Sequence, residues 1–313
     1  MRSKAFLHLL TLSLFAGGLL CAAPPCLAEG SSGNPEEAKI LSADALLAQG
    51  RDSSKKGAFA SAASTWAEAA KLFDQAGNKS RQAEALTRLS QAYQGLGQHQ
   101  DGLKAAEKAL LLAQQEKNEK QRAEALCALG SLFTSLGENE RAQRHIEEGI
   151  RIAGGLGDPD LRARLLNNLG NALAAQRRWE EALRAYQDSA STLQVGTAAA
   201  LAAVNSAFVC VSLGRYGEAR SLVDQALLLT RGLEDSYTKA HALINAGLLC
   251  SDLRSHLADQ AFPLTLLSSQ ALAQAAQVGH AIEDSRTLSY AYGYLGNLYE
   301  SEGRREEALE LTT

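Results

Sequence analysis

The chain has 313 residues, and its 31 basic and 35 acidic residues give a net charge of −4. Aromatic residues make up only 5% of it, which suits helices packed closely on helices. A mildly acidic chain with scattered basic residues lacks the clustered positive charge of nucleic-acid-binding proteins, so we predict no nucleic-acid partner.

The first 28 residues have the features of a secretory signal peptide. Arg2 and Lys4 precede a mainly apolar run, and Cys26 and Ala28 place small residues just before a cleavage point at Glu29. We therefore predict a protein that is exported, either to a periplasm or to the outside of the cell.

Two alternatives for this segment involve the membrane. The apolar run is shorter than the ~20 residues that a transmembrane helix needs, which argues against an uncleaved anchor. A lipid anchor on Cys21 is the other alternative, although Gly18, Leu19 and Leu20 are a poor approach to a lipidated cysteine. No later segment resembles a membrane span, so we expect none after signal cleavage.

Three of the five cysteines remain after signal cleavage. Cys127, Cys210 and Cys250 each fall within an apolar-rich helical pattern, and their spacing matches no zinc motif. We expect them to be small buried hydrophobic residues, and we predict no metal ion and no cofactor.

The rest of the chain, after a flexible leader at residues 29–37, is a repeat. Small residues recur at intervals of 40, and the frame then continues less regularly. A period in this range indicates a solenoid, in which each unit buries its apolar face against its neighbours. We predict an all-α solenoid over residues 38–313. The recurrent small residues are Gly50, Ser90, Gly130, Gly170, Ala207, Gly247 and Gly296.

Each repeat contains two helical patterns separated by a turn. In the second unit Leu86, Leu89 and Tyr93 lie on one helical face before Gly97 ends the pattern. The recurrent small residue must let the paired helix approach closely, and a larger side chain there should destabilise the protein by about 1–3 kcal/mol. We predict seven units, which begin near Ala38, Ser80, Glu119, Pro159, Thr197, Tyr237 and Ile282.

Two stretches carry the residue order of a known repeat family. One contains Leu166, Leu169, Gly170, Ala182 and Tyr186, and the other contains Tyr292, Leu295, Gly296, Tyr299, Gly303 and Ala308. This order resembles the tetratricopeptide repeat, although the period here is longer than the family's usual length of about 34 residues. The resemblance implies a right-handed α–α superhelix whose first helices line a concave, peptide-binding face.

The last two units depart from the period. Unit six gains length at residues 254–262, and we expect its second helix to resume after Pro263. Unit seven is incomplete at Thr313 and lacks the polar cap of a solenoid end. We therefore expect a further C-terminal domain, a partner or self-association to cover that end.

Residues 288–309 are similar to the late repeats of bacterial proteins in which a secreted tetratricopeptide array precedes a caspase-like CHAT domain. Such a domain supplies the His and Cys of peptidase chemistry, and it is not in this sequence. No catalytic residue is therefore carried over. The histidines of the chain are scattered and form no metal or nucleophile motif, so we predict that the chain itself is not an enzyme.

The predicted concave face becomes apolar towards the end of the array. By helical spacing one stripe on each first helix faces inward, and in units two and three this stripe is largely polar. An open apolar stripe typically marks an interaction site. The alternative is that neighbouring helices bury these side chains as ordinary core. The apolar stripe of units five and six contains Leu201, Val204, Phe208, Val211, Ile244 and Leu248.

Asparagines recur at the edge of the same stripe. Asn168, Asn205 and Asn245 occupy equivalent places in three consecutive units. An amide both donates and accepts, so such residues can pair with an extended peptide backbone whatever its sequence. The alternative is packing, in which the amides bridge adjacent first helices. Their companions on or beside the stripe are Asn167, Asn171 and Asn297.

The sequence thus predicts an exported helical-repeat scaffold that binds a protein or peptide on its concave face. A second hypothesis makes the chain the regulatory or substrate-recruiting arm of a CHAT-type cysteine peptidase. A third makes it a structural envelope protein whose apolar stripe is buried.

Overall fold

The computed structural model describes residues 35–193 and 195–312, and within these residues all regular structure is helical. The helices pair into seven consecutive hairpins, as the repeat predicts. The predicted signal peptide and most of the predicted leader lie outside the described residues. The first helices are α1 (Pro35–Lys55), α3 (Lys79–Gly95), α5 (Glu119–Ser135), α7 (Pro159–Ala175), α9 (Thr197–Ser212), α11 (Tyr237–Leu253) and α13 (Ser285–Ser301). The second helices are α2 (Phe59–Gln75), α4 (His99–Gln115), α6 (Asn139–Leu156), α8 (Trp179–Thr192), α10 (Tyr216–Arg231), α12 (Ala261–Ile282) and α14 (Arg305–Thr312).

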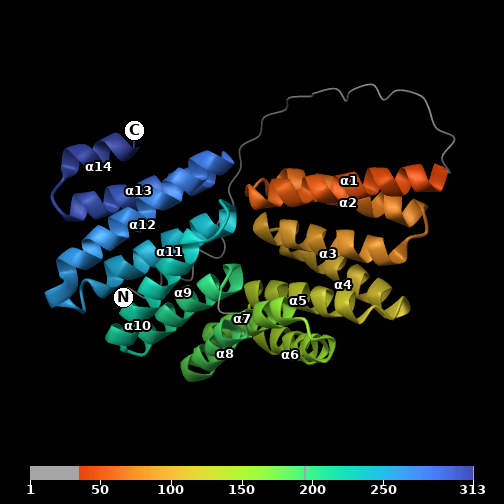
Figure 1. The fold of residues 1–313 in the computed structure, drawn as a ribbon, viewed down its shortest axis with the longest axis horizontal. Coiled ribbons are helices and arrows are strands. Elements are labelled where there is room, and N and C mark those ends of the chain that lie inside the picture. Colours follow the sequence, from red (N-terminus) through yellow and green to blue (C-terminus); the bar gives the residue numbers. More distant parts are fainter. Residues whose placement is uncertain (1–34, 194, 313) are drawn as a thin grey trace.

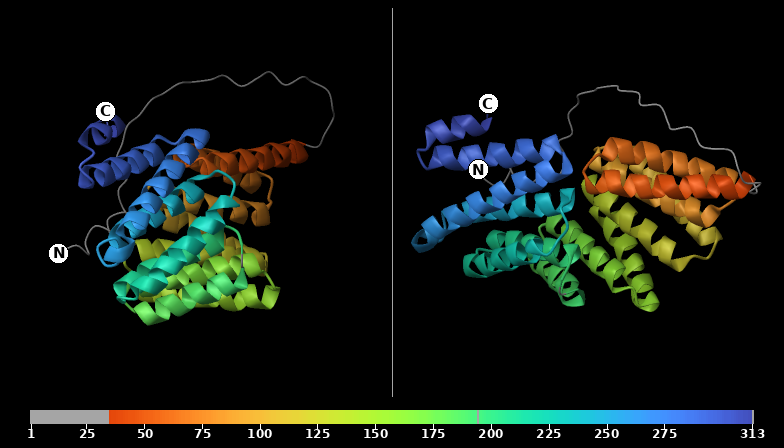
Figure 2. Two further views of the ribbon diagram at one scale, coloured as in Figure 1. Left: turned by 60° about the vertical axis from the view of Figure 1, so that its left-hand side comes forward. Right: turned by 45° about the horizontal axis from the view of Figure 1, so that its top comes forward.

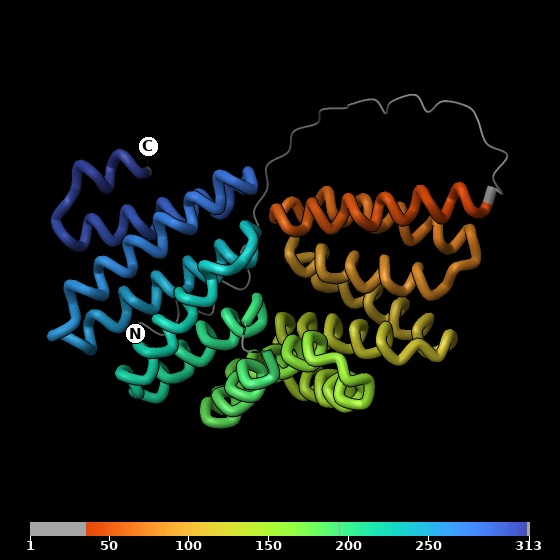
Figure 3. Tube along the Cα trace, in the orientation of Figure 1, coloured from red at the N-terminus to blue at the C-terminus, as the bar shows by residue number. Residues whose placement is uncertain are grey.

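The hairpins stack side by side into a superhelix, which Figures 1 and 3 show in one orientation and Figure 2 in two others. From α3 to α13 each first helix contacts the next first helix, so the odd-numbered helices form a continuous inner layer. Each second helix contacts its own partner, and all of them except α14 also contact the following first helix. The inner face of the superhelix therefore belongs to the first helices.

Side-chain caps fix where most of the first helices begin. The cap residue accepts a hydrogen bond from the backbone N–H three residues later, which satisfies a donor that the first turn leaves free. At Asp158 this bond, together with Lys120, holds the pKa of the carboxyl below its ordinary value. Pro159 then takes the first helical position, as predicted. The capping residues are Asn78, Asn118, Asp158, Ser236 and Asp284.

Two predicted unit boundaries differ from the structure by three residues. The first helix begins at Pro35 rather than Ala38 and takes in the end of the predicted leader, because proline suits the first turn of a helix. The seventh unit begins at Ser285 rather than Ile282, because Asp284 caps α13.

The extra length of unit six forms a short loop. α11 ends at Leu253, a 3₁₀ turn spans Ala258–Gln260, and α12 begins at Ala261. The second helix therefore starts before Pro263, and the predicted later start is wrong. A proline is tolerated in the first turn because its missing N–H has no partner inside the helix there.

Close helix crossings occupy the recurrent small positions. A β-carbon built on Gly50 would lie 2.3 Å from the ring of Trp66, and one built on Gly170 would lie 2.3 Å from the ring of Tyr186. The rings of the second helices thus fill the space that a side chain would need. This confirms that these positions require small residues.

The three cysteines of the described chain are free and buried, as predicted. Burial raises the pKa of Cys210 and of Cys250 to about 12. Thiols with raised pKa values stay protonated and are poor nucleophiles, so both residues serve as core side chains.

Residues 35–193 and 195–312 hold no cluster of three or more His, Cys, Asp or Glu side chains that would suit a metal ion. None of the helices described above combines the length and apolar character needed to cross a membrane.

The superhelix closes on itself where the turn after α1 meets the amino-terminal ends of α11 and α13 (Figure 1). Arg286 Nη2 donates to the Gly57 carbonyl oxygen at 2.6 Å, although 229 residues separate the two in sequence. The guanidinium also lies 5.3 Å from the ring centre of Phe59 and 5.7 Å from that of Tyr237. We name this contact the seam, and its members are Gly57, Phe59, Tyr237, Asp284 and Arg286.

Gly57 is required at the seam for two reasons. Its φ angle of +74° lies in the left-handed region that favours glycine. A β-carbon there would also lie 3.0 Å from Tyr237 and 3.1 Å from the carboxylate of Asp284. The turn after α1 therefore needs glycine so that the amino-terminal ends of α11 and α13 can pack against it.

Candidate functional site

Two adjoining cavities open on the inner layer of the superhelix. The first, of about 440 Å³, is formed by α3, α5, α7 and the start of α9, and we name it the inner cavity. The second, of about 550 Å³, lies between the first three helices and the loop before α11, and we name it the seam cavity. Gln91, Thr197 and Thr238 line both cavities, which therefore form one hollow along the inner face.

Amide side chains supply much of the polar wall of the inner cavity. Gln91 and Gln94 come from α3, and Asn167 and Asn168 come from α7. Gln94 Nε2 donates to Ser131 Oγ of α5 at 2.7 Å, which fixes its orientation. Gln91 has no hydrogen-bond partner among the described side chains, so both its donor and its acceptor face the cavity unused.

Three of the predicted site residues line the inner cavity, namely Asn167, Asn168 and Leu201. Asn168 Nδ2 lies 3.4 Å from the sulfur of Cys127 on the preceding first helix. Leu201 is half-buried, and with Leu193 and Val195 it forms an apolar part of the wall beside the amides and hydroxyls. The cavity can therefore contact both the backbone and an apolar side chain of a bound chain.

Beside the inner cavity the asparagines bond to one another. Asn205 Nδ2 of α9 lies 3.1 Å from Asn167 Oδ1 and 3.2 Å from Asn171 Oδ1, both on α7. Tyr186 Oη of α8 donates to Asn171 Oδ1 at 2.7 Å. Asn171 and Asn205 thus bridge two adjacent first helices. For these two residues the structure matches the alternative in which the amides serve packing.

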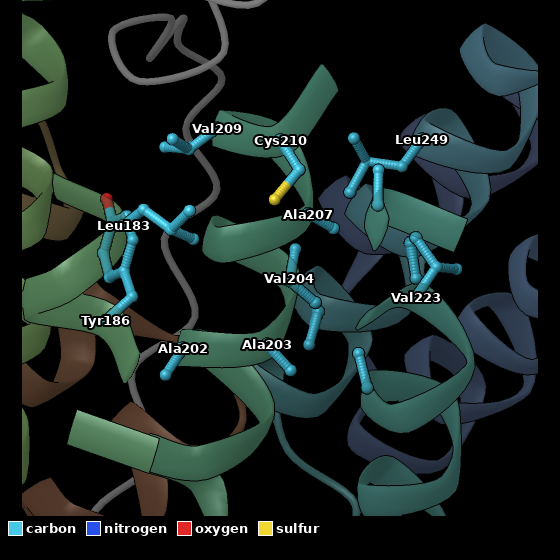
Figure 4. Close-up of a cluster of buried hydrophobic side chains, with 14 of the residues drawn as sticks. Leu183, Tyr186, Ala202, Ala203, Val204, Ala207, Val209, Cys210, Val223 and Leu249 are labelled. Atoms are coloured by element: carbon cyan, nitrogen blue, oxygen red, sulfur yellow. The ribbon is translucent and has the colours of Figure 1, made fainter. Parts of the chain in front are cut away.

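The predicted apolar stripe is not open along its whole length. Val204 and Ile244 are 1% and 3% exposed, because the first helices on either side pack over them. Figure 4 shows Val204 inside the hydrophobic cluster that joins α9 to its neighbours. For these two residues the alternative of ordinary core is correct. The remaining members of the stripe, Leu201, Phe208, Val211 and Leu248, are half-buried.

The predicted row of asparagines is also interrupted. Asn245 Nδ2 lies 3.2 Å from His241 Nδ1 on the same helix, and Asn297 is exposed on α13. Neither residue lines the inner cavity or the seam cavity. Three candidate residues thus line the inner cavity from α7 and α9, and the others lie outside it, either in the core, beside the cavity, or at separate positions on α11 and α13.

Charges of both signs surround the inner cavity. Asp160 and Arg164 of α7 line it. Glu124 of α5 is half-buried nearby. Burial raises the pKa of its carboxyl, although the positive charges of Arg164 and Arg88 act to lower it. A bound chain would thus meet an acidic and a basic group at this end of the hollow.

Several wall residues were missed by sequence reasoning. Leu193, Val195 and Gly196 lie in the loop between α8 and α9, where helical spacing makes no prediction. Arg51 lines the seam cavity only because the superhelix closes, and the repeat period does not reveal closure. Gln91 was predictable from the sequence, because helical spacing places it on the polar part of the inward stripe.

Replacing Asn205 by alanine is expected to lower the free energy of unfolding by about 1–3 kcal/mol, because Asn167 loses the donor that satisfies its buried oxygen. Urea denaturation followed by circular dichroism measures this change. Asn297→Ala removes an exposed amide and serves as the control, with an expected change below about 0.5 kcal/mol. Equal effects of the two substitutions would contradict a bridging role for Asn205.

The stacked hairpins and their continuous inner face define an α-helical solenoid. Tetratricopeptide-repeat models match residues 81–154 and 162–194, which lie in units two to four. These parts of the chain are tetratricopeptide repeats, as the residue order predicted. A sequence search of the curated proteins finds no match to the chain.

Solved structures share the fold over most of the chain. A Rap protein complexed with competence and sporulation factor has a TM-score of 0.61 at 16% identity, over 85% of this chain and 77% of that one. The Rap conjugation gene regulator of plasmid pLS20, in complex with the Phr* peptide, has a TM-score of 0.60 at 15% identity, over 88% and 71%. Aspartyl phosphate phosphatase F from Bacillus subtilis has a TM-score of 0.55 at 14% identity, over 88% and 70%. These similarities confirm the predicted right-handed α–α superhelix.

Proposed function

We propose that the protein is a scaffold that binds a peptide, or an extended segment of a protein, in the inner cavity. The observation that carries this proposal is the set of amide side chains that α3 and α7 direct to one hollow, with Gln91 unbonded among them. Two solenoids of similar fold are complexed with competence and sporulation factor and with the Phr* peptide, which supports a peptide or protein ligand for this fold.

The chemistry of the inner cavity suits an extended chain. A peptide in extended form exposes a donor and an acceptor at every residue, and amide side chains satisfy either without reading the sequence. Leu201 offers one apolar contact, which gives some preference for the side chain placed against it. The volume of about 440 Å³ lies in the usual range of ligand sites, so part of a longer peptide fills it.

Panning a display library of random peptides against the full chain tests the proposal. Enriched peptides are synthesised and their binding is measured by fluorescence anisotropy. Leu201→Glu should weaken binding at least about tenfold, because it places a charge where the ligand's apolar side chain lies. Leu111→Glu changes a leucine that is 54% exposed on α4 and should leave affinity unchanged. Failure to enrich any peptide, or equal binding by both variants, would reject the proposal.

We further propose that the protein is exported, is not itself an enzyme, and is the recruiting arm of a CHAT-type cysteine peptidase. The support is the signal-like segment at residues 1–28 and the repeat pattern at residues 288–309. Fractionation of cells that express the full chain tests export, with recovery in the cytoplasm as the opposing result. Reading the gene beyond codon 313 tests the peptidase link, since a His/Cys domain in frame supports it and a stop codon rejects it.

A further inference from the structure

The seam cavity is lined by more basic than acidic side chains. Arg51, Lys55 and Arg88 line it together with a single acid, Glu234. The whole chain has a net charge of −4, so a wall with more cations than anions has the opposite sign to the chain as a whole. Positive side chains gathered in a concave site raise the local concentration of anions.

Two of these cations are not neutralised by a dedicated partner. Arg51 has no ion pair among residues 35–193 and 195–312. Arg88 Nε lies 3.4 Å from Glu84 Oε1, but the other oxygen of Glu84 is engaged by Arg81. One carboxylate thus serves two guanidinium groups, and Arg88 and Arg51 keep donors for a ligand.

The cavity has one wall on each side of the seam. Residues of α1, α2 and α3 form the first wall, and the loop and helix start at residues 232–238 form the second. Lys55 Nζ and Glu234 Oε2 approach to 3.3 Å across the gap, and the seam contacts of Arg286 lie beside them. The cavity is therefore complete only while the superhelix is closed.

Neutral donors and acceptors complete the lining. Ser54 lies on the first wall, Thr197 lies at the start of α9, and Thr238 lies on the second wall. Gln91 faces this cavity as well as the inner one. A ligand that continues from the inner cavity would thus pass from amides to arginines along one hollow.

We propose that the seam cavity binds an acidic segment of the peptide held in the inner cavity, and that this segment bridges the two walls. The proposal rests on the proposed peptide-binding function and names the chemistry of its ligand. Carboxylates of the segment accept hydrogen bonds from the guanidinium groups of Arg51 and Arg88. A ligand that contacts both walls binds the closed form more tightly and favours closure by the same factor.

Anisotropy with a fluorescein-labelled peptide of alternating Gly and Glu tests the charge preference at low ionic strength. This peptide should bind at least about tenfold more tightly than a matched peptide with Gln in place of Glu. Arg51→Gln and Arg88→Gln should each weaken it about tenfold. Arg144→Gln, which removes an exposed arginine of α6, is the control and should change nothing.

Two outcomes of this titration would overturn the proposal. One is equal binding of the Glu and Gln peptides, and the other is unchanged affinity in both arginine variants. Inorganic phosphate distinguishes the source of the anion. Complete displacement of the peptide by micromolar phosphate would show a site for small phosphates and would reject an acidic peptide segment.

A substitution at the seam tests whether the bound segment bridges the two walls of the cavity. Arg286→Ala removes the hydrogen bond to Gly57 and the contacts with two rings, so small-angle X-ray scattering should show a larger radius of gyration. Affinity for the Glu peptide should fall at least about tenfold because the two walls separate. Arg304→Ala removes a similar contact with the Tyr299 ring away from the seam and should leave both quantities unchanged. An unchanged radius and affinity in Arg286→Ala would refute bridging.

Failure of this proposal is distinguishable from failure of the proposed function. Library peptides that lose affinity in Leu201→Glu but not in Arg51→Gln would show binding in the inner cavity alone. In that case the scaffold function stands and the acidic segment does not. Absence of any peptide binding would instead reject the scaffold function itself.

Discussion

The substitution Trp66→Ala is expected to lower the free energy of unfolding by about 3–5 kcal/mol, as removal of a large buried aromatic side chain usually does. Trp66 is 2% exposed and fills the space left open by Gly50. Its Nε1 also donates to the Leu47 carbonyl oxygen at 3.3 Å, so the change leaves both a cavity and a lost hydrogen bond. Urea denaturation followed by far-ultraviolet circular dichroism measures the effect.

The matched control for this substitution is Leu111→Ala. Leu111 is 54% exposed, and its truncation should change stability by less than about 0.5 kcal/mol. In a solenoid, stability is roughly a sum over units and their interfaces, so Trp66→Ala should first loosen unit one. A loss in Trp66→Ala no larger than that of the control would contradict the packing described here.

The substitution Gly170→Ala is expected to destabilise the protein by about 1–3 kcal/mol, although alanine is normally the better helix former. The added carbon would lie 2.3 Å from the ring of Tyr186, which is 3% exposed and held by Asn171. The ring has no free space in which to move, so the helices must separate. Chemical denaturation of the two proteins under identical conditions gives the difference.

Gly154→Ala provides a control of opposite sign. Gly154 is helical, and a β-carbon there would meet no atom within 4 Å. The exchange should therefore stabilise the protein by up to about 1 kcal/mol through helix propensity alone. Destabilisation at both glycines, or at neither, would show that close approach of the helices is not what selects glycine at position 170.

The sequence was sufficient for the fold because the repeat period, the small residues and the caps agree with one another. Asp158 followed by Pro159 predicts a helix start, and the structure has one there. The less accurate boundaries lie where such signals are weak or conflict. At Pro263, for example, a proline that can either precede a helix or stand in its first turn misplaced the start of α12.

The candidate site was only partly predictable, because it depends on how the superhelix curves. Leu201 and Val204 lie on the same predicted stripe, yet one lines a cavity and the other is core. The difference arises from the packing of α9 between α7 and α11, which one-dimensional spacing does not contain. Arg51 was missed for the same reason, since its cavity forms between units that are distant in sequence.

The seam also bears on the order in which the protein folds. Contacts between neighbouring hairpins are local and form quickly, whereas the bond from Arg286 to Gly57 must close a loop of 229 residues. At ordinary rates of synthesis this stretch takes on the order of ten seconds or more to emerge from the ribosome. Unit one therefore has no partner across the seam until α11 has been made, and Tyr237 then supplies the first contact, with Phe59. The bond from Arg286 follows only with α13, so a nascent chain that is shorter than this cannot complete the ring.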